Sequence, residues 1–265
     1  MKSWAQGLAS LAILVATSGI IGAYNHTVSG ESATTETTTS TSTTETTKET
    51  SKPKETKKER LNKELPKDAK PSDWDLLLTN YNHKLSNQYK PELAYIGSQR
   101  LDKRVLPHYK EMAAAAKKAG YPLTIVSSYR SVDYQEKIYK EQIQLYLNQG
   151  KSQKEAEKET ADYMTKPGTS EHHTGLSLDV LGTAYYEKGG TLDESFAEDK
   201  SAQWLAKHCA EYGFIVRYPK NKVDITKIHY EPWHLRYVGK DNAEYIMSHH
   251  ISLEEYIDEL KEAGR

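Results

Sequence analysis

The order of apolar and polar positions divides the chain into three parts. An apolar run from about Leu8 to Tyr24 contains no charged residue and follows Lys2. Such a run is typical of a signal peptide or a membrane anchor, so residues 1–26 are interpreted as one of these two. Residues 27–65 are mostly Thr, Ser, Glu and Lys, which predicts a disordered linker because so little apolar surface can be buried. Residues 66–265 are expected to form one folded domain.

Apolar periodicity within the third part predicts helices mixed with short strands. Capping boxes at Ser152 with Glu155, and at Ser252 with Glu255, mark the starts of two helices. Helices are expected over about 104–119, 132–148, 152–165 and 201–212 and at the C-terminus, and strands over about 122–128, 175–181, 214–218 and 234–238. Because strands and helices do not alternate regularly, the pattern favours an α+β domain with a small antiparallel sheet flanked by helices.

Composition narrows the classes of protein to consider. The chain has 265 residues, enough for one sizeable domain with accessory segments. Its formal net charge of -1 gives no overall attraction to nucleic acid, so no nucleic-acid partner is expected. The single cysteine, Cys209, cannot form an internal disulfide and lies at helical spacing among apolar residues. We therefore interpret it as a buried side chain, and stability must come from the core or from a metal.

Residues 170–179 form the first cluster with chemical potential. His172 lies on a turn, Gly175 follows, and a predicted strand then brings Ser177 and Asp179 onto one face. The apolar residues of that strand, Leu176, Leu178 and Val180, occupy the other face. A buried aspartate needs a partner, and a metal ion is a suitable one.

Residues 229–237 form the second cluster. Glu231 and His234 are three positions apart, and Pro232 between them prevents a helix, so Glu231 is expected on a turn before a strand that begins at His234. With His172 and Asp179, His234 makes a set of two imidazoles and one carboxylate, which is typical of a catalytic zinc site. His173 remains an alternative ligand to His172. Glu231 would then act as general base on a water molecule at that site.

The third cluster spans residues 127–131. Arg130 lies at the end of a predicted strand, where its planar guanidinium suits a carboxylate or a developing oxyanion, and Gln135 lies one turn into the next helix. Taken singly, a His–Asp pair is usually a structural hydrogen bond and such an arginine is usually a surface ion pair. The functional interpretation rests on the three clusters occurring together in this order.

Two of these clusters match known signatures. Residues 170–179 match S-x-H-x-x-G-x-[AS]-x-D, and residues 231–236 match E-x-W-H-[WFL]-R. The chain therefore resembles the VanY-type zinc D-alanyl-D-alanine carboxypeptidases and the related L,D-carboxypeptidases over about residues 73–240. The resemblance implies a domain like those of hedgehog proteins and D,D-peptidases. Leu235, where an aromatic residue is frequent, and Ser177, where alanine is frequent, are small departures that touch no ligand.

The resemblance also implies a role for each matched position. One Zn²⁺ per chain would be held by His172, Asp179 and His234. Glu231 would be the catalytic base and then the acid that protonates the leaving amine, and Arg130 would face the substrate carbonyl oxygen or the terminal carboxylate. Substrate binding would also involve Gln135, Ser170 and Tyr218.

The implied activity is hydrolysis of the terminal D-alanine from peptidoglycan stem peptides. One alternative is an L,D-carboxypeptidase acting on tetrapeptide stems, and another is a non-catalytic module that binds the cell wall. The presence of Glu231 argues against the non-catalytic module. We expect an extracytoplasmic monomer that is either secreted into the cell wall or attached to the membrane through an uncleaved N-terminal segment.

Overall fold

The structure is a computed structural model that describes residues 55–265. The predicted signal peptide or anchor and the linker up to residue 54 lie outside the described residues. From residue 55 onward, no helix has the length and apolar character needed to cross a bilayer.

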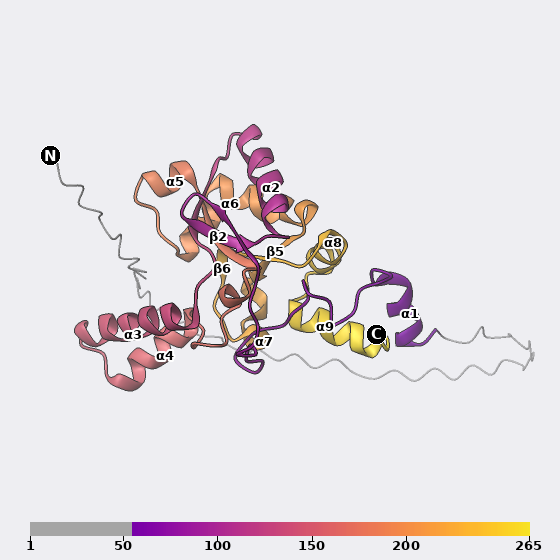
Figure 1. Ribbon diagram of the computed structural model, residues 1–265, viewed down its shortest axis with the longest axis horizontal. Helices are drawn as coiled ribbons and strands as arrows, with labels where there is room; N and C mark the ends of the chain where they lie inside the picture. The colour runs from indigo at the N-terminus through magenta and orange to yellow at the C-terminus, as the bar shows by residue number, and fades with distance from the viewer. Residues whose placement is uncertain (1–54) are drawn as a thin grey trace, which may run out of the picture.

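A small antiparallel sheet forms the centre of the domain (Figure 1). Its four strands lie in the order β3-β4-β6-β5, and every neighbouring pair is antiparallel. Their bounds are β3 (Leu123–Ser127), β4 (Ser177–Gly182), β5 (Phe214–Tyr218) and β6 (Glu231–Tyr237). A separate hairpin pairs β1 (Leu93–Ile96) with β2 (Gln99–Asp102). The predicted α+β class with a small antiparallel sheet is confirmed.

Helices surround this sheet. Those predicted over about 104–119, 132–148 and 152–165 agree with the structure, the one predicted over 201–212 ends as an α-helix at His208, and no range was predicted for residues 240–249. The helices α3 and α4 pack together at one end of the molecule, while α1 and α9 lie at the opposite end (Figure 1). The longer helices are α2 (Leu106–Lys118), α3 (Val132–Asn148), α4 (Gln153–Tyr163), α6 (Lys200–His208), α8 (Lys240–His249) and α9 (Leu253–Glu262). Shorter elements are α5 (Thr183–Glu187), α7 (Val223–Thr226) and the 3₁₀ turns η1 (Glu171–Thr174), η2 (Glu194–Glu198), η3 (Cys209–Tyr212) and η4 (Lys220–Lys222).

Two apolar clusters hold these elements together. The larger one packs the sheet against α2 and α6, and it contains Cys209, which is fully buried as predicted. The smaller one joins Leu61 of α1 to Ile215 of β5 and to the apolar faces of α8 and α9. The second cluster therefore ties both ends of the described chain to the sheet.

The folded part of the chain begins earlier than the linker boundary expected at residue 65. Residues 57–64 form α1 (Lys57–Glu64), which begins with a capping box made by Thr56 and Glu59. Leu61 and Leu65 are each only 2% exposed. The segment is otherwise charged or polar, and so few apolar residues did not predict a folded helix. The burial of the two leucines in the cluster with α9 is a tertiary contact that composition does not indicate.

The expected start of the last strand is also corrected. Strand β6 begins at Glu231 and includes Pro232, whereas the sequence predicted a turn up to His234. Pairing with β4 covers only His234 to Arg236, and the β5 partner is irregular between Val216 and Tyr218. Neither neighbouring strand pairs with position 232. Proline has no amide hydrogen to donate there, so the extended backbone tolerates it.

Candidate metal centre and active site

The sheet and one tight turn bring the predicted ligands together. Asp179 of β4 lies directly opposite His234 of β6 in the strand register. His172 comes from η1, which ends at Gly175 with a left-handed backbone (φ 73°). A Cβ at this position would also lie 3.0 Å from the backbone nitrogen of Asp102, so glycine meets both a conformational and a steric requirement.

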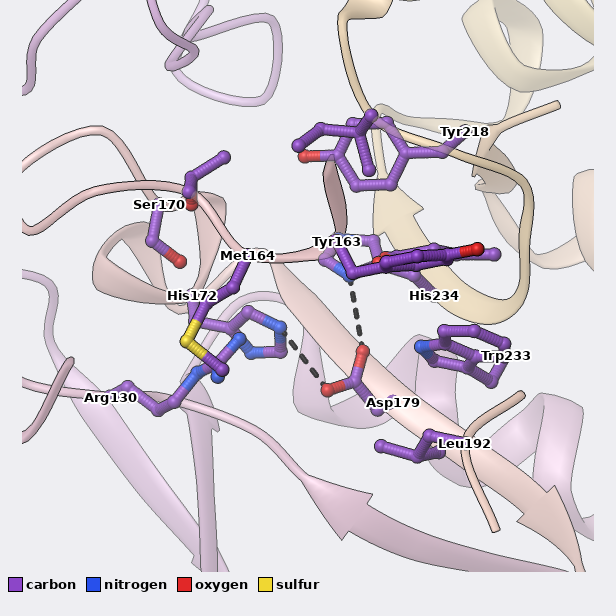
Figure 2. A pocket seen from close by; sticks show the side chains of 13 residues that line it. Arg130, Tyr163, Met164, Ser170, His172, Asp179, Leu192, Tyr218, Trp233 and His234 are labelled. Carbon is purple, nitrogen blue, oxygen red and sulfur yellow. Dashed lines mark ion pairs between the residues drawn. The ribbon is translucent and has the colours of Figure 1, made fainter. Parts of the chain in front are cut away.

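Three side chains converge closely enough to hold one metal ion. His172, Asp179 and His234 are all buried, and their ligand atoms lie within 4.8 Å of one another. The carboxylate of Asp179 lies between the two rings, with Oδ2 at 3.3 Å from His172 Nε2 and Oδ1 at 3.1 Å from His234 Nδ1 (Figure 2). Among the described residues, neither His172 Nε2 nor Asp179 Oδ1 has a hydrogen-bond partner. Buried polar atoms without a partner need one, and two imidazoles with one carboxylate are a set of ligands that zinc prefers.

The structure distinguishes between His172 and His173 as a ligand. His172 donates from Nδ1 to the Ser128 carbonyl at 2.7 Å, which leaves Nε2 facing Asp179. In His173, Nε2 accepts from the Gly168 amide at 3.1 Å, and Nδ1 lies 2.7 Å from the Arg130 carbonyl. Both nitrogens of His173 are therefore engaged by the backbone, which favours His172 as the ligand.

Glu231 lies beside the cluster at the start of β6. It is 5% exposed, and its Oε2 lies 3.5 Å from His234 Nδ1. Burial raises the pKa of the Glu231 carboxyl to about 8, although the neighbouring His234 opposes this rise. Burial likewise lowers the pKa of His172 to about 4, so its ring is neutral at pH 7. His234 differs, because burial lowers its pKa but Asp179 and Glu171 outweigh this effect and raise the pKa to about 9, so binding a metal there requires the loss of a proton.

Arg130 lies next to the same cavity, at the point where β3 leads into α3. Its backbone is held on both sides, because its amide donates to the His172 carbonyl at 3.2 Å and its carbonyl contacts His173. The guanidinium takes part in no ion pair with a described residue, and its buried Nε has no hydrogen-bond partner there. Burial lowers the pKa of this guanidinium, against the pull of Asp179 and Glu231. An unpaired cation in this position can receive an anion.

These residues line one small cavity of about 40 Å³ (Figure 2). Ser170 and Tyr218, which were predicted to bind substrate, are among its lining residues, and the Tyr218 ring lies 4.9 Å from that of His234. Gln135 is not among its lining residues. That side chain is fully buried and donates to the Thr165 carbonyl at 2.9 Å, so it supports the cavity wall. The remaining wall is largely apolar and includes Tyr163, Met164, Leu192, Ile228 and Trp233.

Sequence reasoning missed Glu171, which is 1% exposed and lies between Ser170 and His172. Its Oε1 accepts hydrogen bonds from Arg217 and Arg236, each at 2.7 Å, and its Oε2 lies 3.5 Å from His234 Nε2. The signal that could have found it is an arginine inside each of two apolar strands. Such cations require a buried anion nearby.

The chain matches a known protein family. The family model described as VanY, D-alanyl-D-alanine carboxypeptidase, matches residues 98–240. The chain belongs to the VanY family. A D-alanyl-D-alanine carboxypeptidase of Enterococcus faecalis (strain ATCC 700802 / V583) is 33% identical over 191 residues, which cover 71% of this chain and 68% of that protein. The predicted family is therefore confirmed.

Solved structures of relatives agree with this assignment. The vancomycin-resistance D,D-pentapeptidase VanY, a mutant solved with Zn(II), is 32% identical with a TM-score of 0.63, over 70% of this chain and 99% of that one. The LD-carboxypeptidase LdcB is 37% identical with a TM-score of 0.53, over 74% of this chain and 81% of that one. The protein is a zinc carboxypeptidase of the kind that removes D-alanine, and zinc is its cofactor as predicted.

Proposed function

We propose that this protein removes the terminal D-alanine from pentapeptide stems of peptidoglycan, as a D,D-carboxypeptidase. His172, Asp179 and His234 would hold the zinc ion, which supplies Lewis acidity and a water of lowered pKa. Glu231 lies 3.5 Å from His234 Nδ1, so its carboxyl group, whose pKa is about 8 without the ion, would be ionised by the nearby positive charge and would act as the base. The same carboxyl group would then return the proton to the leaving amine.

The observation that supports removal of a terminal residue is the unpaired guanidinium of Arg130. It lines the same small cavity as the three ligands, and its Nε lacks a partner among the described residues. A free C-terminal carboxylate satisfies a planar guanidinium with two hydrogen bonds, and an internal peptide bond does not. Ser170 lines the same cavity and would bind the peptide backbone.

The lining of the cavity supports an apolar terminal residue. Met164 and Leu192 are among its lining residues, and they suit a methyl side chain. Alanine is the smallest chiral residue, which agrees with loss of a single D-alanine.

Cleavage of tetrapeptide stems is the second candidate activity. It is favoured by the likeness to LdcB, whose 37% identity exceeds the 32% identity to the VanY D,D-pentapeptidase. The two activities differ in the residue before the cleaved bond, which is a D-residue in pentapeptides and an L-centre in tetrapeptides. Product analysis separates them.

The test is mass spectrometry of muropeptides that end in pentapeptide or in tetrapeptide. A protein comprising residues 55–265, loaded with zinc, is compared with its Glu231→Gln variant. Loss of one D-alanine from the pentapeptide alone supports the proposal. Loss from the tetrapeptide alone replaces it with the L,D activity, and no release from either substrate overturns both.

We also propose that the enzyme acts outside the cytoplasm, where such stems are found in the wall. The support is the apolar segment of residues 1–26, which lies outside the described residues, together with the wall substrate. Cell fractionation with an antibody against the folded domain tests this proposal. Recovery of the protein only in the cytoplasmic fraction would overturn it.

A further inference from the structure

Two arginines lie fully buried beside the proposed zinc ligand His234. Arg217 of β5 and Arg236 of β6 are both 0% exposed, and each donates to the same oxygen, Oε1 of Glu171, at 2.7 Å. Burying two guanidinium groups carries a large desolvation cost, which is met only when good partners surround them. The arrangement therefore fixes one carboxylate oxygen very firmly.

Each arginine is held in turn by a segment outside residues 98–240, the range that matches the family model. Arg217 makes a bidentate pair with Glu254 of α9, at 2.9 Å from Nη1 and 2.7 Å from Nη2. Arg236 donates from Nη2 to the carbonyls of Asp75 and Leu77, at 2.9 and 2.8 Å. The chain before and after the family range thus holds the arginines from two sides.

The second oxygen of Glu171 is directed at the metal site. Its Oε2 accepts from Ser177 Oγ at 3.0 Å and lies 3.5 Å from Nε2 of His234. The other nitrogen of that ring, Nδ1, faces Asp179 at 3.1 Å. Glu171 Oε2 and His234 Nε2 are not joined by a hydrogen bond in this structure, but the negative charge of Glu171 favours a proton on Nε2, which leaves the lone pair of Nδ1 free for the metal.

We propose that Glu254, acting through Arg217 and Glu171, is a positioning residue that orients the ring of His234 for zinc. The C-terminal helix α9 is then part of the metal site although it touches no ligand. This inference rests on the assignment of His234 as a ligand. It does not depend on which stem peptide is cleaved, and its test requires no substrate.

The competing explanation is that the ion pairs only attach α9 to the sheet. Glu254→Gln would then lower stability and leave the metal site unchanged. Glu259→Gln is a matched control, because it removes a carboxylate from the same helix. In the wild type, Glu259 Oε2 accepts a hydrogen bond from the Tyr245 hydroxyl at 3.0 Å and makes no hydrogen bond with Arg217. Both variants replace a carboxylate with an amide of nearly the same shape, so they differ mainly in the link to Arg217.

The experiment measures zinc affinity by competition with a chromogenic chelator, and ligand geometry by the visible spectrum of Co²⁺-substituted protein. Glu171→Gln is expected to weaken zinc binding by about 10- to 100-fold, the usual effect of losing a partner of a metal-ligating histidine. Glu254→Gln is expected to weaken it in the same direction by a smaller factor. Both should change the Co²⁺ spectrum, whereas Glu259→Gln should match the wild type.

The double variant tests whether the residues act in one path. If Glu254 acts through Glu171, the Glu171→Gln/Glu254→Gln protein should bind zinc no more weakly than Glu171→Gln alone. Circular dichroism of the zinc-free proteins shows whether each variant folds, and Glu254→Gln alone remains informative if Glu171→Gln does not. The proposal is overturned if Glu254→Gln matches Glu259→Gln in affinity and spectrum, or if the two effects multiply.

Discussion

Asp179 and His234 occupy directly opposed positions on neighbouring antiparallel strands, with Oδ1 of Asp179 3.1 Å from Nδ1 of His234. Opposed residues in such a ladder project to the same face of the sheet, so register alone brings these side chains together. The second oxygen of Asp179 faces His172 at 3.3 Å. The carboxylate therefore lies between both imidazoles, where a single cation would satisfy all three groups.

Replacing this carboxylate should abolish tight metal binding. Asp179→Asn keeps the shape of the side chain but removes the negative charge that a divalent ion requires. Loss of a residue that only hydrogen-bonds a metal ligand weakens binding by up to roughly 100-fold. We expect the loss of zinc affinity in Asp179→Asn to be larger, as measured by competition with a chelator. Asp199→Asn is the control, because asparagine also caps a helix and Asp199 caps α6. Equal zinc affinity in the two variants would contradict the assignment of Asp179 as a ligand.

Glu231→Gln should separate catalysis from metal binding. Glutamine cannot accept the proton, so kcat should fall by about 10²- to 10⁴-fold. Zinc content should remain at the wild-type level, because Glu231 is not among the three clustered ligands. Release of D-alanine from a pentapeptide, measured alongside zinc content, checks both points. A kcat near wild type in zinc-loaded protein would exclude Glu231 as the base.

Much of this site could be predicted because its chemistry is local in sequence. Ser177 and Asp179 are two positions apart in one strand, so spacing alone places them on the same face. Glu231 and His234 were identified by their closeness in sequence, but the turn predicted between them is part of β6. The sequence predicted the strands but not their order, so the pairing of β4 with β6 is known only from the structure. The main helices were predictable because apolar periodicity and capping boxes are local signals.

The parts that escaped prediction depend on contacts distant in sequence. Helix α1 has few apolar residues, and it is stabilised by α9 at the other end of the described chain. Glu171 carries no periodic signal, and its partner Arg217 is 46 positions away. Gln135 was expected to bind substrate, but it donates to the Thr165 carbonyl, 30 positions away. Such pairings are set by tertiary packing and leave little trace in local pattern.

Gly175→Ala should destabilise the turn that carries His172. A left-handed backbone costs an L-residue about 1–2 kcal/mol, and the new Cβ would also lie 3.0 Å from the Asp102 amide nitrogen. Gly189→Ala is the matched control, because Gly189 has φ +87° and a Cβ added there would meet no atom within 4 Å. Urea unfolding should show a larger loss of stability for Gly175→Ala. Equal losses would mean that the turn relaxes away from Asp102.

Helix α1 should contribute to the stability of the domain. Leu61 is 2% exposed in the cluster formed with α8 and α9, so Leu61→Ala should lower the free energy of unfolding by about 2–5 kcal/mol. The neighbouring Arg60 is exposed, and Arg60→Ala should change it by less than about 0.5 kcal/mol. Urea unfolding of residues 55–265 measures both values. If the two variants unfold alike, α1 does not pack against α9 in solution.

The pairing of Glu254 with Arg217 should make the stability of the fold sensitive to acid. Burial raises the pKa of the Glu254 carboxyl, but Arg217 and a hydrogen bond from Asn80 more than offset this and hold the pKa below its usual 4.5. Because the folded-state pKa is the lower one, this carboxylate stabilises the fold above about pH 4.5 and loses that contribution as pH falls toward the folded value. Glu254→Gln has no proton to bind at this position. Urea unfolding of zinc-free protein between pH 7 and pH 3 should therefore show a smaller loss of stability in Glu254→Gln than in wild type. Parallel curves for the two proteins would mean that Arg217 does not lower the pKa of Glu254 in the folded state.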